Sequence, residues 1–366
     1  MNKTVKSLQA VRARIDALDR ELLSKISERA RLAKEIGLIK RASNPSPVFY
    51  RPEREAAVLR AVREANTGPL DDETVAWLFR EIMSACLALE QPLKVAYLGP
   101  TGTFTEQAAI RAFGHAATLM AEPGITEVFR AVASGSVDFG VVPIENSTEG
   151  SISSTLDALA DGDAVICGEV TLRIHQQLMG QGESLASLAG QVSRVVSHAK
   201  SLAQCRNWLD THLPGVERVA VVSNGEAARL AAVEKGTLAI GPSIAAERYG
   251  LTILSANIED TPHNSTRFVV IGREPVPPSG ADKTSLVLST ENRPGSLNNL
   301  LKPLAEAQIS MTRIESRPSR HTAWDYIFFI DIEGHQEDPV VADALAVMRQ
   351  QASMLRVLGS YPKAAI

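Results

Sequence analysis

Apolar residues recur at every third or fourth position near the N-terminus, which is the spacing of one face of an α-helix. The first of them are Leu8, Val11, Ile15, Leu18 and Leu22. No proline interrupts residues 4–40, so the pattern predicts one long helix there. A proline-containing break follows, then a second helix at 52–65 and a third that begins at a cap, Asp71 or Asp72, and ends at Glu90. This part of the chain is predicted to be all helical.

The pattern changes after Pro92. Short β-rich runs now alternate with polar turns and helical segments, and they read LKVAYLG, VDFGVVPIE, SRVVSHA, ERVAVVS and TLAIG. This alternation is typical of an α/β domain. Two of the joints carry capping boxes, which begin at Thr103 and Ser223. Each of these residues either caps its helix or helps the helix N-terminus to bind an anion.

The segment 273–283 is rich in proline and glycine, which indicates a linker. Beyond it the pattern predicts a strand, a helix, two strands, a helix and a strand. These elements are expected at 284–290, 295–307, 310–317, 323–333, 338–350 and 353–361. This order is that of a ferredoxin-like α+β domain.

Two cations interrupt the apolar stripe of the first helix. Arg29 and Lys40 are eleven residues apart, about three helical turns, and therefore point the same way. A buried cation must be paired, extend its charged head into water, or bind a ligand. Glu28, Glu35 and Glu55 are candidate partners. A larger set of cations surrounds the same helical unit, which favours an anionic ligand with more than one carboxylate; the set is Arg12, Arg29, Lys40, Arg51 and Arg54.

The spacing of Arg12 and Arg29 limits how they share a ligand. They are 17 residues apart, roughly 25 Å along one helix. One small molecule cannot contact both from a single straight helix. If both bind it, Arg12 comes from a second subunit whose helix lies antiparallel, so we expect an intertwined dimer.

Composition removes several classes of protein. Hydrophobic residues make up 45% and charged residues 22%, and the net charge is −4. The basic residues follow a helical stripe and form no nucleic-acid patch. The sequence has no apolar run of the roughly 18–20 residues that a membrane helix needs, and no signal-peptide core. Its three cysteines are too scattered for a disulfide framework or a metal cluster, so we expect a cytoplasmic protein without a metal.

Three consecutive segments resemble known domains. Residues 1–91 contain AVRARIDALD, SERARLAKEIGLIK, YRPERE and FREIMSACLALEQ, and resemble the all-helical chorismate mutase dimer domain. Residues 93–272 contain YLGPTGTFTEQAA, VVPIENSTEGSISSTLD, HAKSLAQCRNWL and NSTRF, and resemble the two-lobed, periplasmic-binding-protein-like α/β domain of prephenate dehydratase. Residues 284–361 contain RPGSLNNLL and TRIESRP, and resemble the amino-acid-sensing ACT domain. This order is that of the bifunctional chorismate mutase/prephenate dehydratase family.

The resemblance implies a first activity, the rearrangement of chorismate to prephenate. This concerted reaction needs no nucleophile or cofactor, only a compact pose and stabilisation of negative charge on the breaking ether oxygen. By resemblance, Arg29 and the other subunit's Arg12 hold the carboxylates and Lys40 donates to the ether oxygen. The remaining catalytic candidates are Arg51, Arg54, which adds positive field, Glu55, which accepts from the ring hydroxyl, and Glu90. Glu90 stands where some relatives carry Gln; it can donate only when protonated, and the alternative is an ion pair with Lys40 or an arginine.

The second implied activity converts prephenate to phenylpyruvate with loss of carbon dioxide and the ring hydroxyl. The family assigns the donor role to the Thr of Thr-Arg-Phe, here Thr266, with Arg267 beside it. A threonine hydroxyl is a weak acid, so a hydrogen-bonding or relay role is expected. The residues at strand ends that we expect to line the substrate crevice are Thr103, Asn146, Ser147 and Ser223. His175 and His198 are expected to be structural, and the alternative is that they line the crevice as polar residues.

The ACT resemblance implies feedback inhibition by L-phenylalanine. The effector would bind between a helix N-terminus, with Gly295, Ser296, Leu297 and Asn298, and a partner wall formed by Glu315, Ser316, Arg317 and Pro318. The family's Gly-Ala-Leu-Val pattern reads Gly-Ser-Leu-Asn here, which bears on effector affinity. The sequence leaves open whether dimers pair into tetramers.

Two other functions fit parts of the pattern. A non-catalytic anion sensor would keep the helical segment only for dimerisation, but leucine would serve such a helix better at positions 29 and 40. An oxidoreductase acting on the same substrate would need a nicotinamide site. No Gly-x-Gly-x-x-Gly follows a strand in this sequence, so no cofactor is expected.

Overall fold

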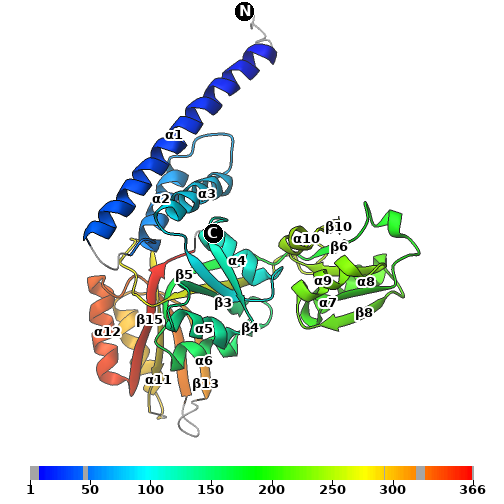
Figure 1. Cartoon of the computed structure of the whole chain (residues 1–366). Helices are drawn as coiled ribbons and strands as arrows, with labels where there is room; N and C mark the ends of the chain where they lie inside the picture. Colours follow the sequence, from blue (N-terminus) through cyan, green and yellow to red (C-terminus); the bar gives the residue numbers. More distant parts are fainter. Residues whose placement is uncertain (1–7, 44–47, 292, 319–325, 365–366) are drawn as a thin grey trace, which may run out of the picture.

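The computed structural model describes residues 8–43, 48–291, 293–318 and 326–364, and it divides into a helical unit, two α/β lobes and a C-terminal α+β unit (Figure 1). The helical unit contains α1 (Leu8–Ser43), α2 (Pro52–Glu64) and α3 (Asp72–Glu90). The predicted cap of α3 is confirmed, because the side chain of Asp71 accepts the N–H of Thr74 at 2.8 Å. The predicted first helix is confirmed over 8–40 and continues to Ser43; residues 4–7 lie outside the described residues.

Most of α1 projects away from the rest of the chain (Figure 1). The helix has 36 residues, so it is about 54 Å long. Its buried residues are only Ala33 and Gly37, near the C-terminal end, where it packs on α3. The apolar stripe is exposed instead, with Leu18 at 56% and Leu22 at 59%. The face that the sequence pattern marks for burial is therefore uncovered within one chain.

The first lobe is built on a mixed sheet whose strand order is β2-β1-β3-β11-β5. Strands β1, β2 and β3 are parallel, whereas β11 is antiparallel to both β3 and β5. The strands are β1 (Lys94–Leu98), β2 (Thr118–Glu122), β3 (Phe139–Asn146), β5 (Val165–Arg173) and β11 (Ser265–Gly272), and the two-residue β4 (Gly150–Ser151) pairs with β3. The helices are α4 (Phe104–Phe113), α5 (Ile125–Ala133) and α6 (Ser153–Asp161).

The second lobe has its own five-stranded sheet in the order β10-β6-β9-β7-β8. Its strands are β6 (Gln177–Gly180), β7 (Arg194–His198), β8 (Glu217–Val221), β9 (Thr237–Gly241) and β10 (Thr252–Ser255). Its helices are α7 (Ala199–Gln204), α8 (Arg206–His212), α9 (Asn224–Val233) and α10 (Ser243–Tyr249), with a 3-10 turn at Ala186–Leu188. The chain passes between the lobes twice, from β5 to β6 and from β10 to β11. The predicted two-lobed α/β architecture is confirmed.

The C-terminal unit is a four-stranded antiparallel sheet in the order β13-β14-β12-β15. Its elements are β12 (Asp282–Ser289), α11 (Ser296–Glu306), β13 (Met311–Pro318), β14 (Tyr326–Glu333), α12 (Pro339–Gln351) and β15 (Met354–Pro362). This confirms the ferredoxin-like order. One face of the sheet packs on α11 and α12 through residues such as Leu286, Leu300 and Met348.

The other face of that sheet packs on the first lobe. Val287, Phe329 and Leu358 share one buried core with Leu156 and Ile166 of the lobe. Strand β15 runs beside β5 in Figure 1. The C-terminal unit is therefore fused to the first lobe by a common hydrophobic core. Among the described residues, no helix is both long and apolar enough to cross a membrane.

Candidate active sites

Lys40 and Glu90 meet where the C-terminal ends of α1 and α3 converge. Lys40 Nζ lies 3.2 Å from Glu90 Oε2 and donates to the backbone carbonyl of Phe49 at 3.1 Å. The helices approach closely here, because a Cβ on Gly37 would lie 3.3 Å from Glu90 Cβ. The structure thus brings together two of the residues expected for the mutase. It also shows the ion pair that the sequence left open as an alternative role for Glu90.

The other mutase candidates are spread over the helical unit. Arg12 is exposed on the projecting part of α1, and Arg29 is half-buried about 25 Å further along the same helix. Arg54 is exposed on α2, and Arg51 pairs with Glu53 at 2.5 Å. One chain therefore does not assemble these cations around a single ligand.

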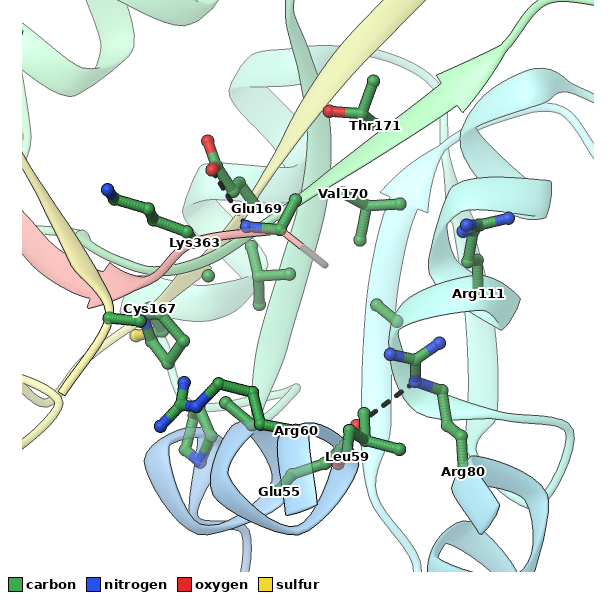
Figure 2. A pocket seen from close by; sticks show the side chains of 18 of the residues that line it. Glu55, Leu59, Arg60, Arg80, Arg111, Cys167, Glu169, Val170, Thr171 and Lys363 are labelled. Atoms are coloured by element: carbon green, nitrogen blue, oxygen red, sulfur yellow. Dashed lines mark hydrogen bonds and ion pairs between the residues drawn. The ribbon is translucent and has the colours of Figure 1, made fainter. Parts of the chain in front are cut away.

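Glu55 faces a different place. Its carboxylate pairs with Arg80 of α3 at 3.3 Å and lines a cavity of about 290 Å³ between the helical unit and the first lobe (Figure 2). Burial raises the pKa of Glu55, and Arg80 opposes the shift. In this structure Glu55 is paired with Arg80, so the single chain does not bring it to Lys40.

The second candidate site is the cleft between the lobes, and Thr266 lies in it. Thr266 is buried, and its hydroxyl oxygen accepts a hydrogen bond from Asn146 Nδ2 at 2.8 Å. The two residues are opposite each other on β11 and β3. The amide of Asn146 is held by its other end, because Oδ1 accepts the N–H groups of Thr148 and Glu149. The structure therefore brings the expected pair together with a defined orientation.

Ser147 ties the same strands together at the edge of the cleft. Its Oγ accepts the N–H of Ser265 at 2.9 Å and donates to Asn264 Oδ1 at 3.3 Å. These contacts hold the segment that leads into Thr266. Its hydroxyl thus has a structural role in this structure.

Two buried polar atoms at the cleft have no hydrogen-bond partner among the described residues. They are Nδ2 of Asn264, a donor, and Oε1 of Gln176, an acceptor. A buried polar group without a partner costs stability, so its presence in a cleft indicates a ligand or water that satisfies it. The sequence analysis did not single out either residue, although NSTRF begins at Asn264.

The second lobe contributes further residues that the sequence analysis missed or assigned to structure. His198, Lys200, Ser201 and Asn224 line the cleft from β7, α7 and α9. Lys200 forms an ion pair with Glu149 across the cleft, so it joins the two lobes. Burial and the neighbouring Lys200 lower the pKa of His198. The motif HAKSLAQ, which holds three of these residues, was the available signal.

Three expected substrate contacts have other roles here. The hydroxyls of Thr103 and Ser223 cap α4 and α9 by accepting the N–H groups of Glu106 and Glu226. Arg267 points away from the cleft, because neighbouring strand residues face opposite sides of a sheet. Its guanidinium pairs with Glu169 and Asp331 instead. The expectation that Arg267 contacts substrate is therefore not supported by this geometry.

The proposed effector residues lie on two elements, and the end of β12 that leads to α11 is at the same end of the sheet as the end of β13, because Ser289 and Arg317 both pair with Ile327. Gly295 has φ of +84° and begins α11, which Ser296, Leu297 and Asn298 continue. Glu315, Ser316, Arg317 and Pro318 lie on β13, the edge strand. Arg317 is already engaged within the chain, since it pairs with Asp157 of α6 at 2.7 Å and donates to the carbonyl of Ser153.

Three family profiles match in the expected order. They are chorismate mutase type II over residues 11–91, prephenate dehydratase over 95–276 and the ACT domain over 284–349. The chain is 54% identical to the bifunctional chorismate mutase/prephenate dehydratase of Pseudomonas aeruginosa over 98% of both chains. The chain belongs to the bifunctional chorismate mutase/prephenate dehydratase family.

Relatives named only as prephenate dehydratases match a shorter part of this chain. The prephenate dehydratase of Mycolicibacterium vanbaalenii is 41% identical and covers 73% of this chain, with 90% of its own length aligned. A solved structure of the Arthrobacter aurescens prephenate dehydratase in complex with L-Phe is 37% identical, with a TM-score of 0.67. It covers 74% of this chain and 90% of its own.

The family assignment gives the chain two activities of phenylalanine biosynthesis. It is a chorismate mutase and a prephenate dehydratase, and it carries an ACT domain. The helical unit corresponds to the first activity and the two-lobed unit to the second.

Proposed function

We propose that the mutase site is shared between two copies of the chain. Lys40 and Glu90 form the centre of the site in one copy. Arg29 of that copy and Arg12 of the other copy hold the two carboxylates of chorismate. The site is completed when α2 meets the second chain, by Arg51, Arg54 and Glu55. The observation that carries this proposal is the exposed apolar stripe of α1, from Leu8 at 66% to Ile36 at 47%. A stripe of this length needs a partner helix.

The chemistry of such a site is electrostatic. The rearrangement breaks a carbon–oxygen bond while a carbon–carbon bond forms, and negative charge grows on the ether oxygen. Lys40 has the charge and the reach to donate to that oxygen, while the arginines hold the substrate in its compact conformation. No step requires a nucleophile or a metal.

A mixing experiment tests the shared site. Arg12→Ala and Arg29→Ala should each abolish mutase activity and leave dehydratase activity on supplied prephenate largely intact. Mixing the two variants after dissociation should restore part of the mutase activity, because a heterodimer contains one intact site. Each variant reassociated with itself is the control. If heterodimers form and mutase activity does not return, the shared site is refuted.

We propose that the interlobe cleft binds prephenate, with Thr266 at the reacting hydroxyl. Asn146 orients the Thr266 hydroxyl by donating to its oxygen, which leaves the Thr266 proton free to point at the departing ring hydroxyl. Asn264 Nδ2, Lys200 and the Nε2 of His198 are the donors available for the two carboxylates. Aromatisation drives the loss of carbon dioxide, so the residues need only bind the carboxylates and help hydroxide to leave as water.

Substitution of Thr266 tests this assignment. Thr266→Ala should lower the dehydratase kcat by about 100-fold or more and let prephenate accumulate from chorismate. Thr266→Ser should retain part of the activity because it keeps the hydroxyl. Thr237→Ala removes another buried hydroxyl, in the second lobe, and should leave kcat unchanged. A near-normal rate in Thr266→Ala would remove Thr266 from the mechanism.

We further propose a role and a setting for the whole chain. The ACT unit binds L-phenylalanine between the start of α11 and the β13 wall of a second copy and thereby inhibits the dehydratase, as the L-Phe complex of a relative suggests.

The domain boundaries are proposed at 1–91, 93–272 and 284–361. A cytoplasmic location fits three buried, free cysteines. Sizing the protein with and without phenylalanine would show whether it forms dimers or tetramers.

A further inference from the structure

A buried ionic cluster lies directly behind Thr266, on the side of β11 that faces the ACT sheet. Its centre is Arg267, whose side chain is 13% exposed. Nε of Arg267 lies 2.7 Å from Glu169, Nη1 lies 2.5 Å from Asp331, and Nη2 donates to the Tyr361 hydroxyl at 2.8 Å. Strand alternation places Thr266 in the cleft and Arg267 in this cluster.

The ACT unit supplies two of the residues that Arg267 contacts, and the first lobe supplies Glu169 and Glu145. Asp331 lies on β14 and Tyr361 on β15, and both also bond to Ser285 of β12. Glu169 belongs to the first lobe, but Lys283 of β12 holds it at 2.9 Å. Burial raises the pKa of Asp331, but Arg267, the Ser285 hydroxyl and Arg313 together outweigh burial and hold this pKa below its usual value. Glu145 of β3 also lies 3.8 Å from Arg267 Nη1 and is 38% exposed, so the cluster is charged and partly open at this side chain.

The cluster is unusual for its position. The surrounding interface is apolar and includes Val287, Phe329 and Leu358. Removing charges from water is costly, and a hydrophobic contact would hold the units together at least as well. An ionic cluster with several directed bonds instead fixes the direction in which the Arg267 side chain leaves β11.

The ladder between β11 and β3 is irregular next to Thr266. Thr266 pairs with Asn146 and Arg267 with Glu145, but Phe268 pairs with Pro143, so the extra residue, Ile144, lies on β3. On its other side β11 pairs with β5 without a shift from Ser265 to Val270. A bulge of this kind changes the aim of nearby side chains, and Arg267 lies on β11 immediately before it.

We propose that Arg267 is a positioning residue for the dehydratase. Its guanidinium, which Asp331 and Tyr361 of the ACT unit hold, sets the position of the Thr266 hydroxyl, and phenylalanine inhibits by changing these contacts. The second half of the proposal rests on the proposed effector role of the ACT unit. An effector that shifts β12, β14 or β15 changes the bonds of Asp331 and Tyr361 first. The change then reaches Thr266 through one residue of backbone.

Two conservative substitutions on the ACT side test the proposal. Tyr361→Phe removes one hydroxyl, and Asp331→Asn removes one charge without changing shape. We expect dehydratase kcat to fall roughly 10- to 100-fold in Asp331→Asn, since small misplacements have effects of that size, with little change in KM. The phenylalanine concentration for half inhibition should rise about fivefold or more in both variants. Mutase activity in the same samples is the internal reference.

Arg356→Met provides the matched control. Arg356 also crosses from β15 to the first lobe, but it donates to the carbonyls of Leu159, Ala160 and Gly162 at the end of α6 and leaves β11 untouched. It should lower Tm while leaving kcat and phenylalanine inhibition as in the wild type.

The outcomes separate the two claims. If Asp331→Asn and Tyr361→Phe lower only Tm, as Arg356→Met does, the cluster is merely structural and the proposal is overturned. If kcat falls while inhibition is unchanged, positioning stands and the coupling is refuted. If phenylalanine fails to inhibit the wild-type enzyme, the proposed effector role fails, whereas the kcat comparison still decides the role of Arg267.

Discussion

Glu90 is the residue whose role depends most on its protonation. As a carboxylate it pairs with Lys40 at 3.2 Å and can only accept hydrogen bonds. An ether oxygen that gains negative charge would be repelled by it. Only the protonated form can donate to that oxygen together with Lys40.

We expect Glu90→Gln to keep mutase kcat/KM, since the amide always can donate a hydrogen bond to the ether oxygen. Glu90→Ala should lower mutase kcat/KM, because it leaves no donor at this position. Glu73→Gln, a matched change on the same helix, is the control. If the Gln variant is as impaired as the Ala variant, Glu90 is a structural partner of Lys40 only.

Helix α7 shows how an element depends on one titrating side chain. It begins after His198, whose Nδ1 accepts the N–H of Lys200 at 3.3 Å as an N-cap. Burial and Lys200 lower the pKa of His198 below its ordinary value of 6.5. Protonation of Nδ1 would convert this acceptor into a donor and remove the cap.

The native state should therefore lose stability in acid at this helix. The pKa of His198 is lower in the folded protein than in the unfolded chain, so the unfolded chain binds the proton first. The free energy of unfolding therefore falls as pH drops below about 6.5. Denaturant midpoints measured between pH 7.5 and 5.5 should fall less in His198→Asn than in the wild type. His263→Asn, an exposed histidine, is the control. Equal losses in both variants and the wild type would contradict the capping account.

At the scale of the whole molecule, the ACT unit and the first lobe share one hydrophobic core. The linker at 273–283 suggests a separable domain, but Val287, Phe329 and Leu358 complete the core of the lobe. Arg267 would also lose Asp331 if the unit were removed.

A chain that ends at residue 281 should therefore be far less stable than the intact protein. It uncovers Leu156, Leu159 and Ile166, each worth roughly 1.5–3 kcal/mol when buried, so we expect Tm to drop by about 10 °C or more. A chain that begins at 92 is the control, because a relative matches 73% of this chain without a mutase in its name. It should keep dehydratase activity. A stable, active chain ending at 281 would show that the two units fold independently.

The sequence by itself determined the elements and the order of the units. Helix periodicity, the Asp71 cap and the βαββαβ order are local properties, because each depends on neighbouring residues and on which side chains must leave water. The family's Thr-Arg-Phe motif located Thr266, and Asn146 was expected at the end of a predicted strand. Strands β2, β4, β5, β6, β10 and β11 were not separated in this way; β4, β6 and β10 have only two to four residues, too few for a periodic pattern.

Only the tertiary structure decided which way the neighbouring side chains face and what they meet. Thr266 and Arg267 are adjacent in the sequence, yet one lies in the cleft and the other among Glu169, Asp331 and Tyr361. Those partners are 64 to 98 residues away, and no local pattern encodes such a contact. The pleat of a strand determines that neighbouring side chains point to opposite sides of the sheet, but long-range packing of separate sheets determines what lies on each side. That packing brings Arg267 to Asp331 and Tyr361 of the ACT unit.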